Sequence, residues 1–261
     1  MLKVAVLGAA GRMGQFLMDC VERNPQTTLC AAVDRPDHPL IGHPVPGREL
    51  PYSSDFPAAA DVIIDFTFHT ASAEHLKQAA KAGIRMVLGT TGFDAGEKRL
   101  IAETARAIPL VFAPNYSLGI NLMLELVNRA ATILGPDYDA EIVEMHHRLK
   151  KDAPSGTALG LAEALAKGRQ VNLPEVAIYG REGIVGERPR GEIGIHALRG
   201  GSVVGDHTVI FAADQERLEI THKASSREAF AVGAVRAAVW LADKPAGLYS
   251  MRHVLGFEPL A

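Results

Sequence analysis

The chain has 261 residues, and its 27 Lys and Arg against 30 Asp and Glu give a formal net charge of −3. This length allows a large core and a division into two domains. The small negative charge gives no general reason to expect a nucleic-acid or membrane partner, and no apolar run approaches the roughly eighteen residues of a membrane span.

The N-terminal segment has the order of elements that is typical of a dinucleotide site. Residues 2–7 predict a buried strand, and a G-x-x-G-x-x-G turn from Gly8 to Gly14 follows at once. A helical pattern and a second strand, residues 28–33, lead to Asp34. Such glycines let backbone N–H groups approach a pyrophosphate at the helix N-terminus, and the acid can reach a ribose hydroxyl. A tight turn without a ligand is the alternative.

Strands and helices then alternate. The strands are expected at residues 62–66, 85–88 and 110–112, and the helices at 71–82 and 94–107. This alternation predicts a parallel, doubly wound sheet with right-handed crossovers. Three polar strand endings, at 66–67, 89–92 and 113–116, fall on the carboxyl edge, where ligands of such sheets bind. Each ending could also be a simple turn, but together they indicate a cofactor and substrate wall.

The pattern changes after about residue 118. Helices are expected at 121–134, 158–167 and 227–241, and strands from residue 141 and at 193–199, 202–212 and 217–222. Turns such as Gly200-Gly201 favour a mostly antiparallel sheet in this region. We predict an α/β Rossmann-like dinucleotide-binding domain, 1–118 with 227–261. An α+β substrate and oligomerisation domain with a mixed, largely antiparallel sheet is predicted for 119–226.

The segment EIVEMHHRLKKDAPSGT, residues 141–157, gathers titratable groups at a strand end. His146 and His147 point to opposite faces of the strand, so they cannot easily share one metal ion, and no metal site is predicted. Glu144 lies on the same face as His146, where its carboxylate could orient the imidazole. The pair could also be ordinary polar residues at a strand end.

A turn and a new helix follow the histidines. Arg148, Lys150 and Lys151 could form a solvated turn, and Ser155 or Thr157 could simply cap the helix. A strand end with titratable groups beside a fresh helix N-terminus can also bind an anion and move protons. The coincidence of these features in one short segment favours a reactive site.

Two features bear on cellular location. The apolar N-terminal run ends at Gly8, which is too short for the apolar region of a signal peptide. Cys20 and Cys30 have no C-x-x-C spacing and suit reduced thiols. We therefore expect a cytoplasmic protein.

Five motifs resemble bacterial dihydrodipicolinate reductases, and they span essentially the whole chain in order. They are VAVLGAAGRMG at 4–14, GTTGF at 89–93, EMHHRLKKDAPSGTA at 144–158, GEIGIHALRGGSVVGDHTV at 191–209 and LEITHKASSREAFAVGAVRAAVWL at 218–241. The resemblance implies reduction of 4-hydroxy-tetrahydrodipicolinate to tetrahydrodipicolinate with NADH or NADPH, in diaminopimelate and lysine synthesis. It also implies a cytoplasmic homotetramer in which the sheets of the second domains pack together.

The resemblance also implies roles for single residues. His146 would be the proton donor or acceptor and Lys150 the proton donor, while His147, Gly156 and Thr157 would hold the dicarboxylate substrate. The implied cofactor contacts are Gly8, Ala9, Ala10, Gly11, Arg12, Met13, Asp34, Arg35, Gly89, Thr90, Thr91, Ala113, Pro114, Asn115 and Tyr116.

The choice of cofactor is divided in the sequence. Asp34 favours NADH, because its carboxylate can accept hydrogen bonds from the ribose hydroxyls. Arg35 can pair with the 2′-phosphate of NADPH, or it can simply point into solvent. Two other classes remain as alternatives. A different nicotinamide oxidoreductase would explain the N-terminal half of the chain, and a non-catalytic nucleotide sensor would need neither His146 nor Lys150.

Overall fold

The computed structural model describes residues 1–257, and the chain forms two compact units. Unit 1 comprises Met1–Leu118 together with Arg227–Ala261, and unit 2 comprises Gly119–Ser226. The assignment of dinucleotide binding to the first of these ranges, and of substrate binding and tetramerisation to the second, stays a prediction. No helix within the described residues is long and apolar enough to cross a membrane.

Unit 1 is built on a seven-stranded sheet in the order β12-β6-β5-β4-β1-β2-β3, with every neighbouring pair parallel. The strands are β1 (Leu2–Leu7), β2 (Thr27–Val33), β3 (Tyr52–Ser53), β4 (Val62–Asp65), β5 (Arg85–Leu88), β6 (Pro109–Phe112) and β12 (Gly247–Tyr249). Most are continuous apolar runs, as expected where both faces of a parallel sheet are covered. The predicted Rossmann-like fold is confirmed.

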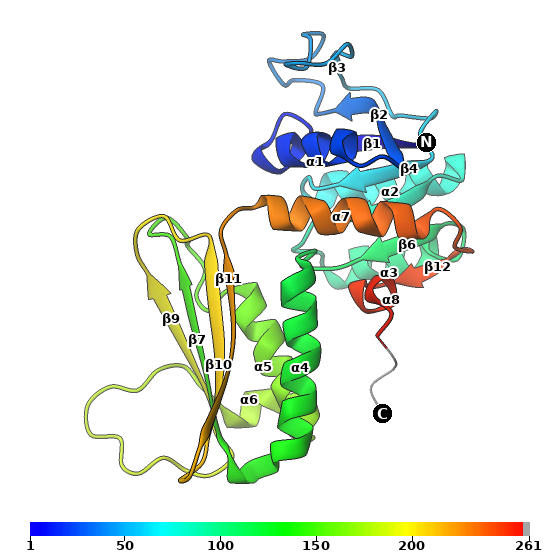
Figure 1. The fold of residues 1–261 in the computed structure, drawn as a ribbon. Helices are drawn as coiled ribbons and strands as arrows, with labels where there is room; N and C mark the ends of the chain where they lie inside the picture. The colour runs from blue at the N-terminus through cyan, green and yellow to red at the C-terminus, as the bar shows by residue number, and fades with distance from the viewer. Residues whose placement is uncertain (258–261) are drawn as a thin grey trace. The chain divides into compact units, whose positions relative to one another are not determined.

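Helices cover both faces of this sheet (Figure 1). They are α1 (Arg12–Arg23), α2 (His69–Ala82), α3 (Ala95–Thr104), α7 (Glu228–Leu241) and α8 (Met251–Leu255). Side chains of α1, α7 and α8 pack in one core cluster, and those of α2 and α3 pack in a second cluster. Each face of the sheet therefore has its own hydrophobic core.

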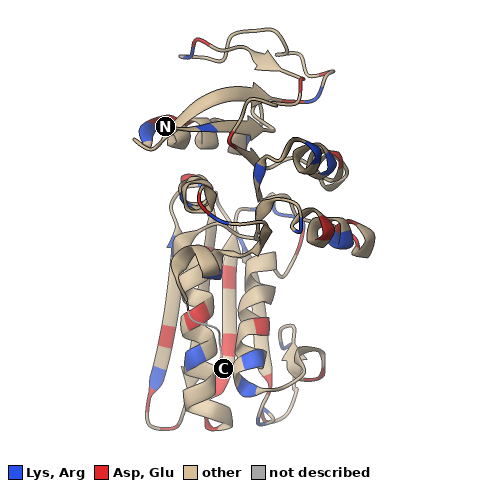
Figure 2. Ribbon diagram, turned by 90° about the vertical axis from the view of Figure 1, so that its right-hand side faces the viewer, with Lys and Arg blue, Asp and Glu red and all other residues tan. Residues whose placement is uncertain are grey.

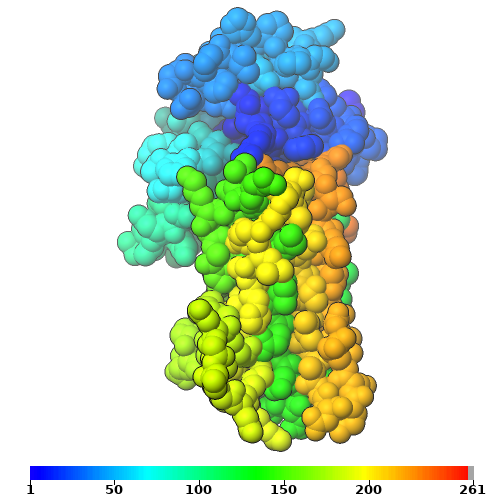
Figure 3. Space-filling view, turned by 90° about the vertical axis from the view of Figure 1, so that its left-hand side faces the viewer, coloured from blue at the N-terminus to red at the C-terminus, as the bar shows by residue number. Residues whose placement is uncertain are grey.

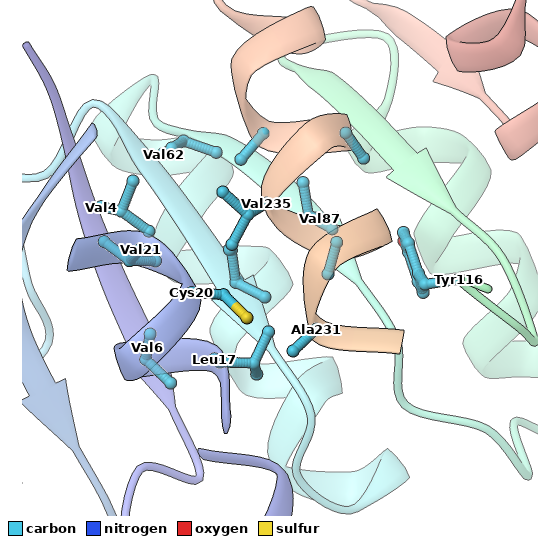
Figure 4. Close-up of a cluster of buried hydrophobic side chains, with 14 of the residues drawn as sticks. Val4, Val6, Leu17, Cys20, Val21, Val62, Val87, Tyr116, Ala231 and Val235 are labelled. Atoms are coloured by element: carbon cyan, nitrogen blue, oxygen red, sulfur yellow. The ribbon is translucent and has the colours of Figure 1, made fainter. Parts of the chain in front are cut away.

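Helix α7 belongs to unit 1 although the chain reaches it only after unit 2. Helices α1 and α7 face each other over the sheet (Figure 4). The side chains between them include Leu17 and Cys20 of α1 and Ala231 and Val235 of α7. Helix α7 comes so close to the segment that follows β6 that a Cβ on Gly233 would lie 1.8 Å from the carbonyl oxygen of Tyr116. Glycine is therefore required at position 233 by close packing.

The helix predicted at 94–107 is shorter in the structure. Asp94 and Glu97 form a capping box at its start, and α3 ends at Thr104. The next residues form three-residue turns, with the Ala107 N–H donating to the carbonyl of Thr104 at 2.9 Å. The chain therefore leaves the α-helix at Thr104 through these turns. Ile108 precedes Pro109 and would avoid the helical conformation, which limits any longer helix.

Unit 2 contains a five-stranded sheet in the order β11-β10-β7-β9-β8. Its strands are β7 (Asp139–His146), β8 (Ala177–Ile178), β9 (Ile193–Arg199), β10 (Gly205–Ala212) and β11 (Arg217–Ala224). Strand β10 is antiparallel to β7 and β11, whereas β9 is parallel to β7 and β8. The mixed sheet is confirmed, with the antiparallel pairings on one side of β7 and the parallel pairings on the other.

The turn at Gly200-Gly201 does not join a hairpin, which corrects the expectation from the sequence. Strands β9 and β10 lie on opposite sides of β7, and residues 200–204 cross over its end. The Gly200 N–H donates to the carbonyl of His146 at 2.9 Å, and the His147 N–H donates to that of Val203 at 2.7 Å. The crossing segment thereby takes over the hydrogen bonds of β7 where the strand ends.

Helices α4 (Leu118–Leu134), α5 (Gly156–Arg169) and α6 (Leu173–Val176) cover one face of the sheet, and a 3₁₀ turn, Gly135–Asp137, follows α4. Among the described residues of unit 2, no helix covers the other face, and the green, yellow and orange strands lie at the surface there (Figure 3). Acidic and basic residues are interspersed along the helices of both units (Figure 2), in keeping with the small net charge.

Candidate active site

The glycine turn of unit 1 forms a backbone cradle between β1 and α1. Gly8 has a φ of +78°, and a Cβ there would lie 2.7 Å from the carbonyl oxygen of Phe66. A Cβ on Gly14 would lie 2.3 Å from the carbonyl oxygen of Gly8, so the helix packs directly on the turn. Helix α1 begins after Gly11 with no side-chain cap. An uncapped helix N-terminus reached through glycines suits an anionic phosphate group.

Asp34 organises the same edge of the sheet. One carboxylate oxygen accepts the Ala10 N–H at 2.9 Å, and the other accepts the Arg35 N–H at 2.9 Å. The Arg35 side chain is two-thirds exposed, and its Nε lies 3.4 Å from Asp37 Oδ1. A carboxylate at the end of β2 is in the position from which a ribose hydroxyl is bound in this type of fold.

A pocket of about 480 Å³ lies along this edge. It is lined by Leu7, Gly8, Ala10, Gly11, Val33, Asp34, Arg35, Pro36, His38, Ser54, Phe66, Thr67, Phe68, Ala71 and His75. The residues present therefore fit the adenosine and pyrophosphate part of a nicotinamide dinucleotide. This pocket does not include every residue predicted to contact the cofactor. Those outside its lining are Ala9, Arg12, Met13, residues 89–91 and residues 113–116.

Residues 89–91 and 113–116 follow β5 and β6 at the same carboxyl edge of the sheet. A Cβ on Gly89 would lie 2.2 Å from the ring of Phe66, so a larger residue there would have to displace that ring. The Tyr116 hydroxyl is buried 3.0 Å from the carbonyl oxygens of Leu88 and Val111. Burial raises the pKa of Tyr116 well above its ordinary value. The Tyr116 side chain therefore holds β5 and β6 together, which leaves its backbone for any contact with a cofactor.

Asp65 is a residue whose importance the sequence reading missed. It is fully buried, accepts the N–H and hydroxyl of Thr67 at 3.0 and 2.7 Å, and lies 2.8 Å from His75 Nδ1. The hydroxyl of Thr90 in turn accepts the Thr67 N–H at 3.0 Å. This network ties the ends of β4 and β5 together. The sequence did contain a sign of this role, because Asp65 follows three apolar residues of a buried strand. A buried charge almost always has partners.

In unit 2, Glu144 is the centre of a second buried network. Its Oε2 lies 2.5 Å from His146 Nδ1, and its Oε1 accepts the Ser155 N–H at 3.0 Å. Arg199 donates to both oxygens at 2.9 Å. Burial acts to raise the pKa of Glu144, but the hydrogen bonds from Arg199, His146 and Ser155 outweigh it and hold the pKa below its ordinary value. Glu144 therefore orients His146 as an ionised acceptor.

His146 also contacts a second imidazole. The rings of His146 and His207 meet edge to face with centroids 5.2 Å apart, and His207 Nε2 lies 3.0 Å from Ser155 Oγ. Burial, together with the neighbouring His146, lowers the pKa of His207 to about 4. His207 is therefore neutral near pH 7, and His146 is the imidazole of this pair that is linked to a carboxylate.

The turn after β7 carries the other predicted substrate-site residues. Lys150 Nζ lies 2.9 Å from Asp152 Oδ2, and this contact lowers the pKa of the Asp152 carboxyl. The Lys150 N–H donates to the carbonyl of His147 at 3.1 Å, which closes the turn. His147 Nδ1 is buried and has no hydrogen-bond partner among the described residues. The structure thus brings His146, His147 and Lys150 to one end of β7.

Helix α5 begins beside this turn. Ser155 is its cap, with Oγ accepting the Ala158 N–H at 3.1 Å, which settles which of the two candidate residues caps the helix. Gly156 is the first helical residue, and no atom would lie within 4 Å of a Cβ built on it. Open space at a helix N-terminus beside His147 and Lys150 suits a carboxylate. Within the described residues, no group of three or more His, Cys, Asp or Glu could hold a metal ion.

A parallel sheet with a glycine cradle, joined in one chain to an α+β unit with a buried acid–base network, defines the class of two-domain nicotinamide-dependent oxidoreductases. Residues 2–116 match the family model described as dihydrodipicolinate reductase, N-terminus, and residues 119–255 match the one described as dihydrodipicolinate reductase, C-terminus. The chain belongs to the dihydrodipicolinate reductase family. Members of this family are oxidoreductases that use NADH or NADPH.

Two relatives named 4-hydroxy-tetrahydrodipicolinate reductase are similar over nearly the whole chain. The protein from Pseudomonas fluorescens is 52% identical over 99% of this chain and 100% of its own length. The protein from Psychrobacter arcticus is 47% identical over 99% of this chain and 96% of its own length. Both identities cover both units.

Solved structures show the same fold. The dipicolinate-bound dihydrodipicolinate reductase from Paenisporosarcina sp. TG-14 superposes with a TM-score of 0.78 at 26% identity, covering 96% of this chain and 97% of that one. The DAP dehydrogenase of C. glutamicum, in complex with DAP, gives a TM-score of 0.57 at 12% identity, covering 99% of this chain and 96% of its own. The second likeness extends to the fold alone.

Proposed function

We propose that the protein reduces 4-hydroxy-tetrahydrodipicolinate to tetrahydrodipicolinate with NADH or NADPH, a step of diaminopimelate and lysine biosynthesis. The observation that carries the proposal is the Glu144–His146 pair beside Lys150 and the N-terminus of α5, in a chain of this family. In the net reaction a hydride and a proton enter the ring and water leaves. The protein must therefore supply protons next to a dianionic ring.

Unit 1 would hold the cofactor. The glycine turn and the start of α1, residues 8–13, would hold the pyrophosphate, Asp34 the adenosine ribose, and residues 89–91 and 113–116 the remainder at the same sheet edge. The N–H groups of residues 8–11 already donate within unit 1, so those of Arg12 and Met13 at the start of α1 are the expected donors to the pyrophosphate. The cofactor, when bound, supplies the hydride. Asp34 and Arg35 both line the adenosine pocket, which supports the use of either NADH or NADPH.

Unit 2 would hold the substrate. His147 and the backbone of Gly156 and Thr157 would bind its carboxylates, since a helix N-terminus favours an anion along its axis. The relative from Paenisporosarcina has dipicolinate bound, a ring with the same two carboxylates. The unpartnered Nδ1 of His147 is suited to such a hydrogen bond.

His146 and Lys150 would carry the protons. Glu144 takes the Nδ1 side of His146, so Nε2 is the nitrogen left to give or accept a proton. The Lys150 ammonium stabilises negative charge that develops on the ring nitrogen and donates a proton to it. Asp152 holds this ammonium in place until the substrate enters.

A cytoplasmic homotetramer is part of the proposal. Three apolar residues of unit 2 alternate with the buried residues of their strands: Val143 and Met145 in β7 and Ile210 in β10. They therefore lie on the face of the sheet that no helix covers among the described residues. On the same face Glu141 accepts hydrogen bonds from Arg181 and Arg188. An apolar strip flanked by paired charges is typical of interfaces between identical subunits. Sedimentation analysis tests the tetramer.

A coupled assay tests the activity. The preceding synthase makes the substrate from pyruvate and aspartate semialdehyde, and the loss of NADPH absorbance reports its reduction. A non-catalytic nucleotide sensor would bind NADPH without any such loss, and that result would refute the proposal. Pyridine-2,6-dicarboxylate should inhibit more strongly than pyridine-2-carboxylate, and equal inhibition would argue against a second carboxylate site.

A further inference from the structure

We propose that Arg199 is a positioning residue that fixes both the acid–base His146 and the segment leading into the N-terminus of α5. The role of His146 in this inference rests on the proposed function. Arg199 lies 53 positions after His146 in the chain and carries no role by resemblance. Its place is set by the parallel pairing of β9 with β7, in which Arg199 is the register partner of His146.

One guanidinium joins three segments of unit 2. Its NH1 and NH2 atoms each donate to Glu144, one to each carboxylate oxygen, at 2.9 Å. NH2 also donates to the backbone carbonyl of Asp152 at 2.7 Å. Arg199 therefore connects β9, the inner face of β7 and the turn that precedes Ser155. Its side chain is only 20% exposed, so these contacts replace water.

Glu144 receives four donors, and two of them come from Arg199. The other two are His146 Nδ1 at 2.5 Å and the Ser155 N–H at 3.0 Å. The Glu144 side chain is fully buried. A buried carboxylate that loses its main cationic partner is strongly destabilised, and it then depends on whatever donors remain. Without Arg199, the remaining donors would be His146 Nδ1 and the Ser155 N–H.

This arrangement determines how firmly the imidazole of His146 is held. The titratable and charged groups around its ring are Glu144 on β7, Arg199 on β9 and His207 on β10, with Lys150 and Asp152 in the following turn. Arg199 balances the charge of Glu144 and binds both of its oxygens, so the carboxylate keeps the position from which it orients the imidazole. A planar, bidentate guanidinium suits this task better than the single ammonium of lysine.

The test compares Arg199→Met with Arg199→Lys. Arg199→Met should lower kcat by about 10–100-fold, the range seen when a group behind a site's ligands is removed. The basic limb of its pH–rate profile should move to higher pH, because Glu144 then holds the protonated imidazole more strongly. Arg199→Lys should retain the wild-type pH profile with a smaller loss of kcat. The KM for NADPH should change less than about twofold in both variants.

A matched control removes another arginine from the same sheet. Arg217 pairs with Glu219 on β11, and its side chain is 64% exposed. Arg217→Met should keep both the rate and the pH profile of the wild type. A loss of kcat in Arg199→Met with an unshifted pH profile would mean that Arg199 only maintains the fold, and it would overturn the proposal.

A spectroscopic measurement separates this inference from the proposed function. ¹⁵N NMR of labelled histidine, with His146 assigned through His146→Asn, reports which ring nitrogen of His146 carries the proton. The wild type should show Nδ1 protonated, and Arg199→Met should shift the His146 resonances while Arg199→Lys shifts them less. If the protein proves inactive on the proposed substrate but this pattern holds, the positioning role stands without the reaction. Identical His146 resonances in wild type and Arg199→Met would overturn the role of Arg199.

Discussion

Each unit has a helix that follows a strand of its sheet, α1 after β1 in unit 1 and α5 after β7 in unit 2. The N-termini of these two helices differ in how they are capped and in the residues beside them. In unit 1, α1 follows a glycine turn, has no side-chain cap, and packs so closely on the turn that Gly14 leaves no room for a Cβ. In unit 2, α5 is capped by Ser155. The end of β7 carries the buried Glu144 and His146, and the turn between β7 and α5 carries His147 and Lys150.

We propose that this difference separates cofactor binding in unit 1 from proton transfer in unit 2. A cradle of backbone N–H groups recognises phosphate through geometry, and it does not change its charge with pH. The network around Glu144 contains groups that can exchange protons, and its geometry is held by hydrogen bonds between segments distant in sequence. Mutations in unit 1 should therefore act on cofactor affinity, and mutations around β7 should act on turnover.

The largest expected effect tests this separation directly. Lys150→Met should lower kcat by roughly 10²–10⁴-fold, the range for a general acid, and leave the KM for NADPH nearly unchanged. Lys151→Met removes the neighbouring exposed charge and should behave like the wild type. The measurement is steady-state kinetics with both substrates varied. A Lys150→Met variant with near-normal kcat would show that the turn after β7 binds substrate without donating a proton.

In unit 1, Arg35→Ala should weaken the binding of NADPH by about 1.5–3 kcal/mol, the scale of a hydrogen bond to a charged group. The binding of NADH should hardly change. The Arg35 guanidinium is mostly exposed beside Asp37, so it can turn to a 2′-phosphate. The ratio of KM values for the two cofactors, in wild type and variant, measures the effect. An equal loss for both cofactors would mean that Arg35 is structural and that Asp34 alone sets the preference.

The acid–base network should also make unit 2 sensitive to acid. The pKa of His207 is lowered from 6.5 to about 4, so between these values the unfolded chain binds a proton that the folded chain does not. Stability should therefore fall as the pH falls, with His207 contributing about 2 kcal/mol of loss between pH 7 and pH 5. Urea unfolding of wild type and His207→Gln measures this contribution as the difference between their pH dependences. Parallel curves for the two proteins would contradict it.

The smallest effect concerns the glycines of the two helices. Gly160 lies within α5, and a Cβ there would meet only Leu124 Cδ2 at an ordinary 3.8 Å. Gly160→Ala should therefore stabilise the protein by about 0.5–1 kcal/mol through helix propensity. Gly14→Ala, in contrast, places its Cβ 2.3 Å from a carbonyl oxygen and should destabilise it. Thermal unfolding of both variants checks these opposite signs, and a stabilising Gly14→Ala would contradict the close packing of α1.

The parts of the fold that could be predicted from the sequence depend on local signals. The strand, glycine turn and acid of unit 1 follow one another within 34 residues, and the Glu144–His146 pair follows from the alternation of one strand. Strands β3 and β12 were missed because two or three residues carry no recognisable pattern. The placement of β9 and β10 on either side of β7 was missed because strand order depends on contacts that no local pattern encodes.

The residues of the candidate site likewise fall into those that a local pattern reveals and those that only the sheet pairing brings together. The titratable residues of the EMHHRLKK segment could be selected from the sequence because they lie close together in it. The contact between Glu144 and Arg199 spans 55 positions, and the one between Ser155 and His207 spans 52. Such partners become visible only when the pairing of the sheet is known. The roles of the individual site residues stay predictions that the experiments above test.

The return of the chain to unit 1 has a consequence for biosynthesis. Helix α7 contributes Ala231, Ala234, Val235, Ala237, Ala238 and Leu241 to a core whose other members come from the first 120 residues and from the segment around α8. During translation, the N-terminal strands therefore emerge long before the helix that covers one of their faces. Unit 2 is continuous in sequence, Gly119–Ser226, and needs no residue made after Ser226 for its own contacts. The order of synthesis thus places the completion of unit 1 last, and nascent chains stopped near residue 226 would expose an apolar sheet face to chaperones.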